Sequence, residues 1–449
     1  MRKKRLNLST THIIMLSFMV AVLVGSLLLS LPISSADGQG VRYIDALFTA
    51  TTATCVTGLV TVTTATAWSS FGHAVILVLI QIGGLGIITV MSGLMILINR
   101  KMGIGDRLLI QDAFNLNTLS GLAVFVKKVV LGTFIIEGIG ALMYMTVFVP
   151  QFGARGVWIS VFNSISAFCN AGMDIIGENS LADYARNPII NFTSSALIIL
   201  GGIGYVVWWD LIRVFGDKNK KGALKKLTLH SKIALVSSII LVFVGGGLIL
   251  LLEYNNPLTL AGHSLFDKIQ MSLFQSVTTR TAGFAAIPQQ NLTDSSAIVS
   301  LLLMFIGGSP VGTAGGVKTV TFVVLLASAI ANVRGQKEVT LFNRRIAKSA
   351  VEKSATVCTM SFGIMFISTL LLSLVCKAPF MDILYETASA TATVGLTRGI
   401  TPYLNEIGKI IIIFTMYLGR VGPISLALAL GGKTKNNIIK NPVEDISVG

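Results

Sequence analysis

One short segment type occurs four times in this sequence, and its recurrence limits what the chain can fold into. Each copy begins with an apolar–aromatic pair, continues with small and hydroxyl residues, and reaches a glycine nine or ten residues after the aromatic. One such cluster is usually an ordinary loop, but four copies at equivalent places indicate an internal repeat. The copies are DALFTATTATCVTGLV, SVFNSISAFCNAGMDI, SLFQSVTTRTAGFAAI and DILYETASATATVGLT.

The segments that flank these copies are long and apolar. A membrane-spanning helix needs about 20 predominantly apolar residues, and only 12% of the 449 residues are charged, against about 25% in soluble domains. We therefore predict an all-α polytopic membrane protein, whose first apolar run is a spanning helix rather than a signal peptide. The predicted spans are about 12–32, 73–98, 123–149, 189–212, 233–252, 295–330, 356–376 and 405–431.

The formal net charge of +15 comes from basic residues that flank apolar segments. They cluster in MRKKR, NRKMGIGDR, RVFGDKNKKGALKK, VRGQKEVTLFNRRIAK and KTKNNIIK. Such clusters mark the cytoplasmic side of a membrane protein. Both termini are therefore expected in the cytoplasm, the lipid bilayer is the expected surrounding, and no nucleic-acid partner is expected.

The predicted fold consists of four units, each a helix, a re-entrant pore loop and a second helix, around a pseudo-fourfold pore. Non-helical backbone at membrane depth must be buried in protein or line a watery cavity, and four segments converging on one axis meet that condition. Four unrelated surface loops are the alternative, which the register of the copies makes much less favoured. The units are 1–110, 111–220, 221–345, and 346–449 with the C-terminal tail.

The converging segments suit a desolvated monovalent cation. Glycine permits backbone angles that turn carbonyl oxygens inward, and rings of carbonyl oxygens can replace the hydration shell of a cation. The C-terminal ends of four short helices would direct partial negative charge toward the same axis. No aspartate or glutamate lies at the level of the glycines, which argues against a calcium-type filter.

The sixth apolar segment, 295–330, is too long for one span. Its 36 residues would extend about 54 Å as a helix, against a hydrocarbon core of about 30 Å. Five glycines and a proline lie between Gly307 and Gly316. We therefore predict two helical pieces around an irregular loop, with Ser309 and Thr313 buried. A kinked helix whose glycines pack closely is the alternative.

Two cationic residues within the apolar segments need separate interpretation. Arg420 lies near the middle of the last span, where a charge costs about 2.5–3.5 kcal/mol and usually faces a pore or a partner. Snorkelling is the alternative, although both interfaces are distant from this position. Lys318 follows a glycine run that looks like a phosphate loop, but Val317 interrupts the motif and no strand precedes it. A phosphate site is therefore rejected.

These motifs together resemble the Trk/Ktr/HKT superfamily of potassium transporters. The resemblance is carried by TATTATCVTGLV, QIGGLGIITV, SVTTRTAGF, GGSPVGTAGGVKT and TATVGLTRGI, and it covers nearly the whole chain. Because it lacks long extensions, the chain is most similar to KtrB-type membrane subunits of bacterial Ktr systems. In this family a single chain imitates a tetrameric potassium channel.

The resemblance implies a filter in which backbone carbonyls bind potassium, and a gate below it. Glycine rather than serine at position 58 implies potassium selectivity, and Arg280 in the shorter third copy is expected to point behind the filter. The implied filter residues are Cys55, Val56, Thr57, Gly58, Cys169, Asn170, Ala171, Gly172, Arg280, Thr281, Ala282, Gly283, Ala392, Thr393, Val394 and Gly395. The implied gate residues are Gly307, Gly308, Ser309, Gly312, Thr313, Gly315, Gly316 and Arg420.

The resemblance also implies a potassium-translocating subunit of a bacterial uptake system in the plasma membrane, and not an enzyme. No covalently bound cofactor is expected. The expected transported or activating ion is K⁺, and Na⁺ is the second candidate. A homodimer controlled by a cytosolic ring of nucleotide-binding subunits of the RCK/KtrA type is expected. Apolar residues in the basic cytoplasmic segments would contact these partners, since lipid headgroups would account only for the charges. They are Leu108, Ile110, Phe114 and Phe342.

Two other classes of function are weighed against a pore. A secondary transporter of another small cation or solute would use inverted repeats and broken helices, whereas an even number of spans separates equivalent positions here. An intramembrane enzyme would need acidic, histidine or cysteine groups within the spans, where Glu137 is the main acidic residue. The sequence does not reveal whether potassium transport is coupled to sodium.

Overall fold

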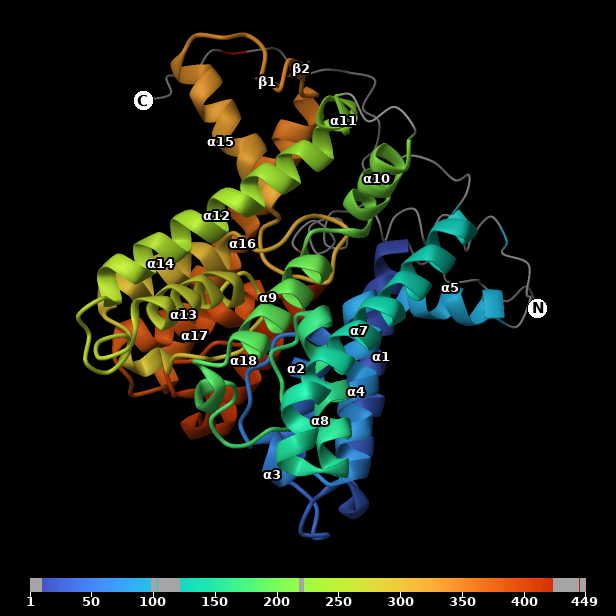
Figure 1. Ribbon diagram of the computed structural model, residues 1–449, viewed down its shortest axis with the longest axis vertical. Helices are drawn as coiled ribbons and strands as arrows, with labels where there is room; N and C mark the ends of the chain where they lie inside the picture. Colours follow the sequence, from blue (N-terminus) through green and yellow to red (C-terminus); the bar gives the residue numbers. More distant parts are fainter. Residues whose placement is uncertain (1–9, 98–102, 104–121, 218–221, 423–443, 445–449) are drawn as a thin grey trace.

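The described part of the chain is predominantly helical, as predicted, and contains one short two-stranded hairpin (Figure 1). The computed structural model describes residues 10–97, 103, 122–217, 222–422 and 444. The predicted boundaries between units at 110 and at 220 lie outside these residues, and the boundary at 345 coincides with the end of the hairpin.

The elements fall into four successive groups. The first contains α1 (Thr10–Leu29), η1 (Pro32–Ser34), α2 (Tyr43–Cys55), α3 (Thr64–Ala67), α4 (Ser70–Leu85) and α5 (Ile87–Leu97). The second contains α7 (Leu122–Phe152), α8 (Ala154–Cys169), η2 (Ala182–Tyr184), α9 (Pro188–Gly202) and α10 (Tyr205–Gly216). The third contains α11 (Ala223–Lys226), α12 (Leu229–Glu253), α13 (Leu265–Thr278), η3 (Gln289–Asn291), α14 (Asp294–Phe305), α15 (Thr319–Val333), β1 (Thr340–Leu341) and β2 (Arg344–Arg345). The fourth contains α16 (Lys348–Val375), α17 (Phe380–Ala392), η4 (Thr401–Tyr403) and α18 (Glu406–Val421).

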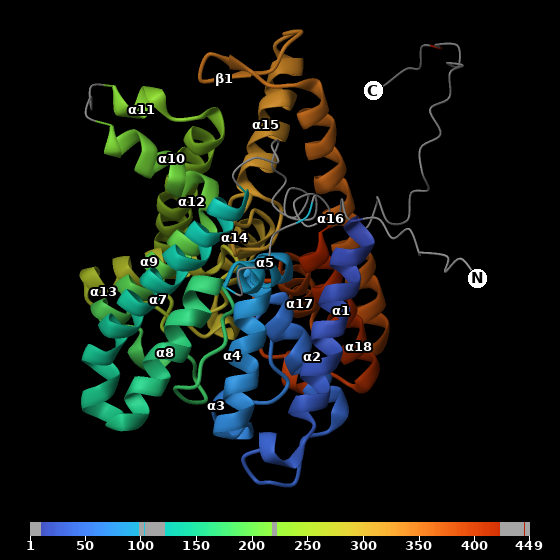
Figure 2. The same cartoon turned by 90° about the vertical axis from the view of Figure 1, so that its right-hand side faces the viewer.

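Each group follows the same local plan. A long first helix packs against the short helix that follows it: α1 against α2, α7 against α8, α12 against α13, and α16 against α17. The short helices contact the second helix of their own or a neighbouring group, and α18 packs against α2, so the last group meets the first. Both views place α15 and the hairpin at one end of the molecule and α3 at the opposite end (Figure 2).

The second helix is interrupted in the first three groups, which corrects the expectation of uninterrupted spans over 73–98 and 189–212. Gly86 separates α4 from α5, and Gly204 lies between α9 and α10, which are bent by 96°. At Gly204 φ is +95° and ψ is +136°. Residues other than glycine rarely adopt this conformation, and because it is not helical, the helical hydrogen bonding stops there. Gly422 has a similar conformation after α18, and the rest of the predicted span 405–431 lies outside the described residues.

The predicted break in 295–330 is confirmed. The helix α14 ends at Phe305 and α15 begins at Thr319, and the hydroxyls of Ser309 and Thr313 belong to fully buried residues. A single kinked helix is therefore excluded. By length and hydropathy, α1 from His12, α12 and α16 are continuous helices that could cross a membrane, and α9 with α10 forms a bent fourth candidate.

The glycine clusters of the second helices let backbones approach closely. In three groups, a methyl group placed on the glycine three residues before the break would collide with a carbonyl oxygen at the end of a short helix. A larger residue would therefore push the short helix away from its support. The pairs are Gly83 with Thr54, Gly201 with Phe168, and Gly419 with Thr391.

A buried ion pair fastens the last group to the first. Lys409 on α18 lies 2.6 Å from Asp45 in the first turn of α2, and their side chains are 4% and 2% exposed. The exposed Arg42 binds the other oxygen of Asp45 at 3.0 Å. Because the two charges are desolvated together, removing one of them leaves the other buried without its main partner.

Substitution Lys409→Met is therefore expected to destabilise the folded chain by about 3–5 kcal/mol, the usual cost of breaking a buried pair. The measurement is thermal unfolding in detergent. The double variant Lys409→Met with Asp45→Asn should recover most of the loss, because no unpaired charge remains. Lys353→Met, on the exposed face of α16, is the control. Equal unfolding midpoints for Lys409→Met and this control would contradict the assignment.

Candidate functional site

The four short helices bring their following glycines to one place. A methyl group on Gly58 would lie 2.6 Å from the carbonyl oxygen of Ala171 and 3.2 Å from the Cα of Gly172. Equivalent close approaches occur between each group and the next, and the fourth returns to the first, so the glycines form a closed ring. The glycine-to-carbonyl approaches are Gly58 to Ala171, Gly172 to Ala282, Gly283 to Val394 and Gly395 to Thr57.

The backbone before each glycine alternates in handedness. Two residues before the glycine, and at the glycine itself, φ is positive, whereas the residue between them has no positive φ. A positive φ is uncommon for residues other than glycine and costs on the order of 1–3 kcal/mol. Strain of this kind persists where the surroundings impose it, often at functional sites. The pairs with positive φ are Val56 and Gly58, Asn170 and Gly172, Thr281 and Gly283, and Thr393 and Gly395.

The amide groups of these strained segments are bound by the short helices behind them. In the first group, Thr52 accepts from the amide of Thr57 through its carbonyl at 2.8 Å and from the amide of Gly58 through its hydroxyl at 2.9 Å. In the fourth group, Ser389 accepts from Val394 and Gly395 in the same way, at 2.8 and 3.0 Å. The amides are thereby satisfied away from the ring, and the carbonyl oxygens remain on the ring side.

The second and third groups differ in detail. The carbonyl of Ser166 accepts from Ala171 at 2.8 Å, and its hydroxyl accepts from Met173, one residue beyond the ring glycine, at 3.2 Å. In the third group the segment from the aromatic residue to the ring glycine is one residue shorter, and the hydroxyl of Thr278 donates to the carbonyl of Phe284 at 2.7 Å. The ring is therefore only approximately fourfold.

Arg280, in the shorter third segment, points away from the ring. Its guanidinium donates to the hydroxyl of Ser238 on α12 at 3.2 Å, and its side chain is buried. The equivalent Cys169 is also buried behind the ring, where its sulfur lies against Gly84. Among the sixteen predicted filter residues, Arg280 and Cys169 therefore lie behind the ring.

A cavity of about 480 Å³ lies on one side of the ring, and all four ring glycines line it. Its wall also contains Asp174, two residues after Gly172. Burial raises the pKa of Asp174 to about 6, although a hydrogen bond from the amide of Ile176 partly offsets this effect. The carboxyl group is therefore mostly ionised above pH 6, and it adds negative charge to the cavity wall.

The irregular loop 306–318 lies on the opposite face of the ring segments from this cavity: Gly315 lies against Ala392 and Thr393, which precede a ring glycine, whereas the cavity is lined by the ring glycines and residues that follow them. It is anchored on the end of α9, because the amides of Ser309 and Thr313 donate to the carbonyls of Gly202 and Gly201 at 2.8 and 3.1 Å. The amide of Tyr205 donates to Val311 at 2.9 Å. The bend at Gly204 thus provides the backbone groups that hold the loop.

The loop also contacts the ring segments directly. The hydroxyl of Thr313 donates to the carbonyl of Phe168 at the end of α8, and the amide of Gly315 donates to the hydroxyl of Thr281, both at 3.0 Å. Arg420 donates to the carbonyl of Thr313 at 2.7 Å and to that of Gly83. The predicted gate residues and Arg420 therefore form one connected cluster beneath the ring.

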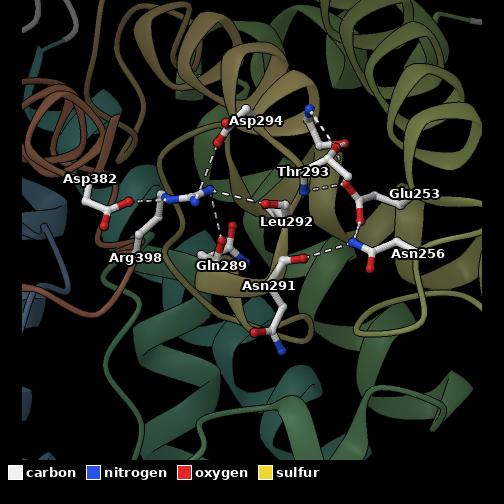
Figure 3. Close-up of polar contacts among 10 residues, drawn as sticks. Glu253, Asn256, Gln289, Asn291, Leu292, Thr293, Asp294, Asp382 and Arg398 are labelled. Atoms are coloured by element: carbon white, nitrogen blue, oxygen red, sulfur yellow. Dashed lines mark hydrogen bonds and ion pairs between the residues drawn. The ribbon is translucent and has the colours of Figure 1, made fainter. Parts of the chain in front are cut away.

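An arginine on the cavity side links the third and fourth groups (Figure 3). Arg398 pairs with Asp382 at 2.7 Å and with Asp294 at 3.8 Å. It also donates to the carbonyls of Gln289 and Leu292 at 3.5 and 3.4 Å. The segment after Gly395 is thus fastened to the linker that precedes α14.

Glu253 at the end of α12 holds the same end of this linker from the other side of Thr293 (Figure 3). Its carboxylate accepts from the amide and hydroxyl of Thr293 at 2.9 and 2.7 Å, and from Asn256 at 2.6 Å. These contacts fix the start of α14, from which the loop beneath the ring descends.

Several residues of this site were not predicted from the sequence. The hydroxyl residue four positions after each aromatic is present in every copy, and that shared spacing could have revealed it. Arg398 and Lys409 carried no such signal, because their partners are distant in the chain or in another group. The missed hydroxyl residues are Thr52, Ser166, Thr278 and Ser389.

Comparison with known proteins gives consistent results over the whole chain. The TrkH family, described as cation transport protein, matches residues 2–436. Ktr system potassium uptake protein B of Bacillus subtilis is 38% identical over 99% of this chain and 98% of its own length. Potassium/sodium uptake protein NtpJ of Enterococcus hirae is 37% identical over 100% of this chain and 99% of its own.

The fold is also found in a solved structure. The crystal structure of the potassium transporter TrkH from Vibrio parahaemolyticus superposes with a TM-score of 0.77, covering 96% of this chain and 87% of that one. The two sequences are 17% identical, so this match concerns the fold alone.

Proposed function

Because the chain belongs to the TrkH family of cation transport proteins, we propose that it is the potassium-translocating pore subunit of a bacterial potassium uptake system. The observation that carries this proposal is the closed ring of Gly58, Gly172, Gly283 and Gly395 at the base of an open cavity. The names of the two curated relatives support potassium as the ion, with sodium as a second ion in one of them.

The ring acts on the ion through backbone oxygens. The carbonyls before the ring glycines lie between neighbouring groups, as the approach of Ala171 to Gly58 illustrates. Their partial negative charges replace the water shell of a cation, and the C-terminal ends of four short helices add to the favourable field. None of the sixteen filter residues is acidic, which suits an ion of single charge. Asp174 helps to collect cations in the outer cavity.

The loop 306–318 and Arg420 form the gate. The loop lies beneath the ring and is held there by contacts to three groups, so a cation that leaves the ring meets the loop and the guanidinium. Opening requires the bond between Arg420 and Thr313 to break, together with the contacts of Thr313 and Gly315. The arrangement described is therefore the closed one.

A pore accounts for the geometry better than a secondary transporter. The four groups follow each other in the same order around one axis and close upon themselves. Alternating access through inverted repeats would instead place the site between two halves of opposite orientation. No enzymatic role is proposed.

The chain works in the plasma membrane, with both termini in the cytoplasm, as a homodimer bound to a cytosolic ring of nucleotide-binding subunits. The support is the basic character of the predicted cytoplasmic segments and the half-exposed Phe342, at the turn of the hairpin that projects from one end of the molecule. The other predicted contacts, Leu108, Ile110 and Phe114, lie outside the described residues.

Substitution Gly58→Ser tests the ring. Gly58 has a φ of +100°, and its Cβ would lie 2.6 Å from the oxygen of Ala171, so one carbonyl must move. Discrimination of potassium from sodium should fall by roughly tenfold or more, equivalent to about 1.4 kcal/mol. Uptake in a bacterium without other potassium uptake systems, with sodium as competitor, is the measurement.

Gly38→Ser is the matched control for this substitution. Its φ is also positive, at +70°, but no atom lies within 4 Å of the added carbon. The control separates backbone strain from the collision at the ring. Unchanged selectivity in Gly58→Ser would remove this glycine from the filter.

Shortening the loop by residues 309–314 tests the gate. Flux should rise and depend less on any partner, because the contacts of Thr313 with Phe168 and Arg420 disappear. The measurement is ion flux into liposomes containing the purified chain. Thr313→Val, which removes only the hydroxyl bond, should raise flux less. A shortened chain that folds but conducts less would place the gate elsewhere.

The assembly is tested by mass measurement of the detergent-purified chain, alone and with the cytosolic ring. A dimer is expected, and Phe342→Ala should weaken ring binding because a half-exposed aromatic side chain is lost from the contact. Exposed Phe366 on α16, changed to alanine, is the control on a different element. A strictly monomeric chain, or ring binding unaffected by Phe342→Ala, would contradict the proposal.

A further inference from the structure

The ring carbonyls are held in place by side chains that lie entirely behind them. We propose that Thr52 and Ser389 are positioning residues whose hydroxyl groups set the discrimination between potassium and sodium. This inference rests on the proposed function and assigns its selectivity to two side chains that never meet the ion. The hydroxyls accept from the amides of Gly58 and Gly395 at 2.9 and 3.0 Å.

Each of these residues binds two successive amides. Thr52 holds the amide of Thr57 through its carbonyl and that of Gly58 through its hydroxyl. A peptide plane is rigid, so an amide fixed behind the ring fixes the carbonyl of the preceding residue on its opposite edge. The hydroxyl bond to Gly58 therefore orients the oxygen of Thr57. In the same way, Ser389 orients the oxygen of Val394.

The two oriented oxygens occupy adjacent positions in the ring. The oxygen of Thr57 lies against Gly395, and that of Val394 lies against Gly283. The first and fourth groups are therefore neighbours in the ring, and in both of them a side-chain hydroxyl accepts from the amide of the ring glycine. In the second group the hydroxyl of Ser166 binds the next amide instead, and in the third Thr278 donates to a carbonyl. Half of the ring depends on this one type of bond.

Water cannot substitute for these hydroxyls. Thr52, Ser389 and Gly58 are buried, so an amide that loses its acceptor is left unsatisfied. The peptide then rotates to find another partner, which moves its oxygen relative to the ion. A sodium ion needs shorter contacts than a potassium ion, and a ring with a mobile oxygen accommodates both.

The alternative is that these hydroxyls merely stabilise the ends of the short helices. The same helices provide the controls that separate the two roles. Thr51, beside Thr52, is equally buried, but its hydroxyl donates to Leu47 within the helix at 2.7 Å. Thr391, near Ser389, donates to Thr387 at 2.7 Å. Neither hydroxyl contacts a ring amide.

The experiment compares Thr52→Val with Thr51→Val, and Ser389→Ala with Thr391→Val, in the full chain. Each purified variant is placed in liposomes, and initial uptake of Rb⁺, as a substitute for potassium, and of Na⁺ is measured. Thr52→Val and Ser389→Ala should lower the Rb⁺-to-Na⁺ ratio about tenfold, the effect of one lost hydrogen bond. The Thr51 and Thr391 variants should keep the original ratio, and so should Thr52→Ser.

A second measurement does not depend on flux. Rb⁺ bound at the ring should raise the unfolding midpoint of the original chain more than Na⁺ does, and this difference should shrink in Thr52→Val but not in Thr51→Val. A selective original chain with equal ratios and equal midpoint differences in Thr52→Val and Thr51→Val would overturn the inference. An original chain that neither transports nor binds Rb⁺ would overturn the proposed function itself.

Discussion

The rest of this structure depends on one requirement, that buried backbone groups outside helices must find hydrogen-bond partners. In the segments around the ring this requirement is met for the amides, which donate hydrogen bonds to the short helices behind them. The carbonyl oxygens of these segments face the axis instead. Thr52 and Ser389 do this with both a carbonyl and a hydroxyl. The positive φ angles at Val56 and Thr393 persist because the bonds of Thr52 and Ser389 fix the two peptide groups that follow each of these residues.

The departures from fourfold symmetry are concentrated in the third group. The third group has the shorter segment before Gly283, the long interruption between α14 and α15, and the linker held by Arg398 and Glu253. A loop that crosses beneath a ring can come from one group only, so exact fourfold symmetry and this single loop are incompatible. The buried pair of Lys409 and Asp45 closes the opposite seam, between the last group and the first.

Much of the site could be predicted because its signals are local and repeated. The aromatic-to-glycine spacing identified the ring glycines, and the glycines between Gly307 and Gly316 predicted the interruption. The breaks at Gly86 and Gly204 were missed, because a glycine in an apolar helix is as often a packing position as a stop. Here Gly201 serves the first role and Gly204 the second, only three residues later. Sequence spacing does not distinguish these roles, since each depends on which backbone lies opposite.

The sequence by itself determined the helical class, the four copies, the glycines of the ring and the position of the broken segment. These follow from composition, periodicity and residues whose backbone preferences are strong wherever they occur. Only the tertiary structure decided the closed order of the ring, the partners of Arg420 and Arg398, and which hydroxyls bind which amides. Those features include contacts between residues far apart in the chain, such as Arg420 and Gly83, which are 337 positions apart. The chemistry of a side chain limits the kinds of group that it can bind, but the tertiary structure determines which of those groups lies within hydrogen-bonding distance.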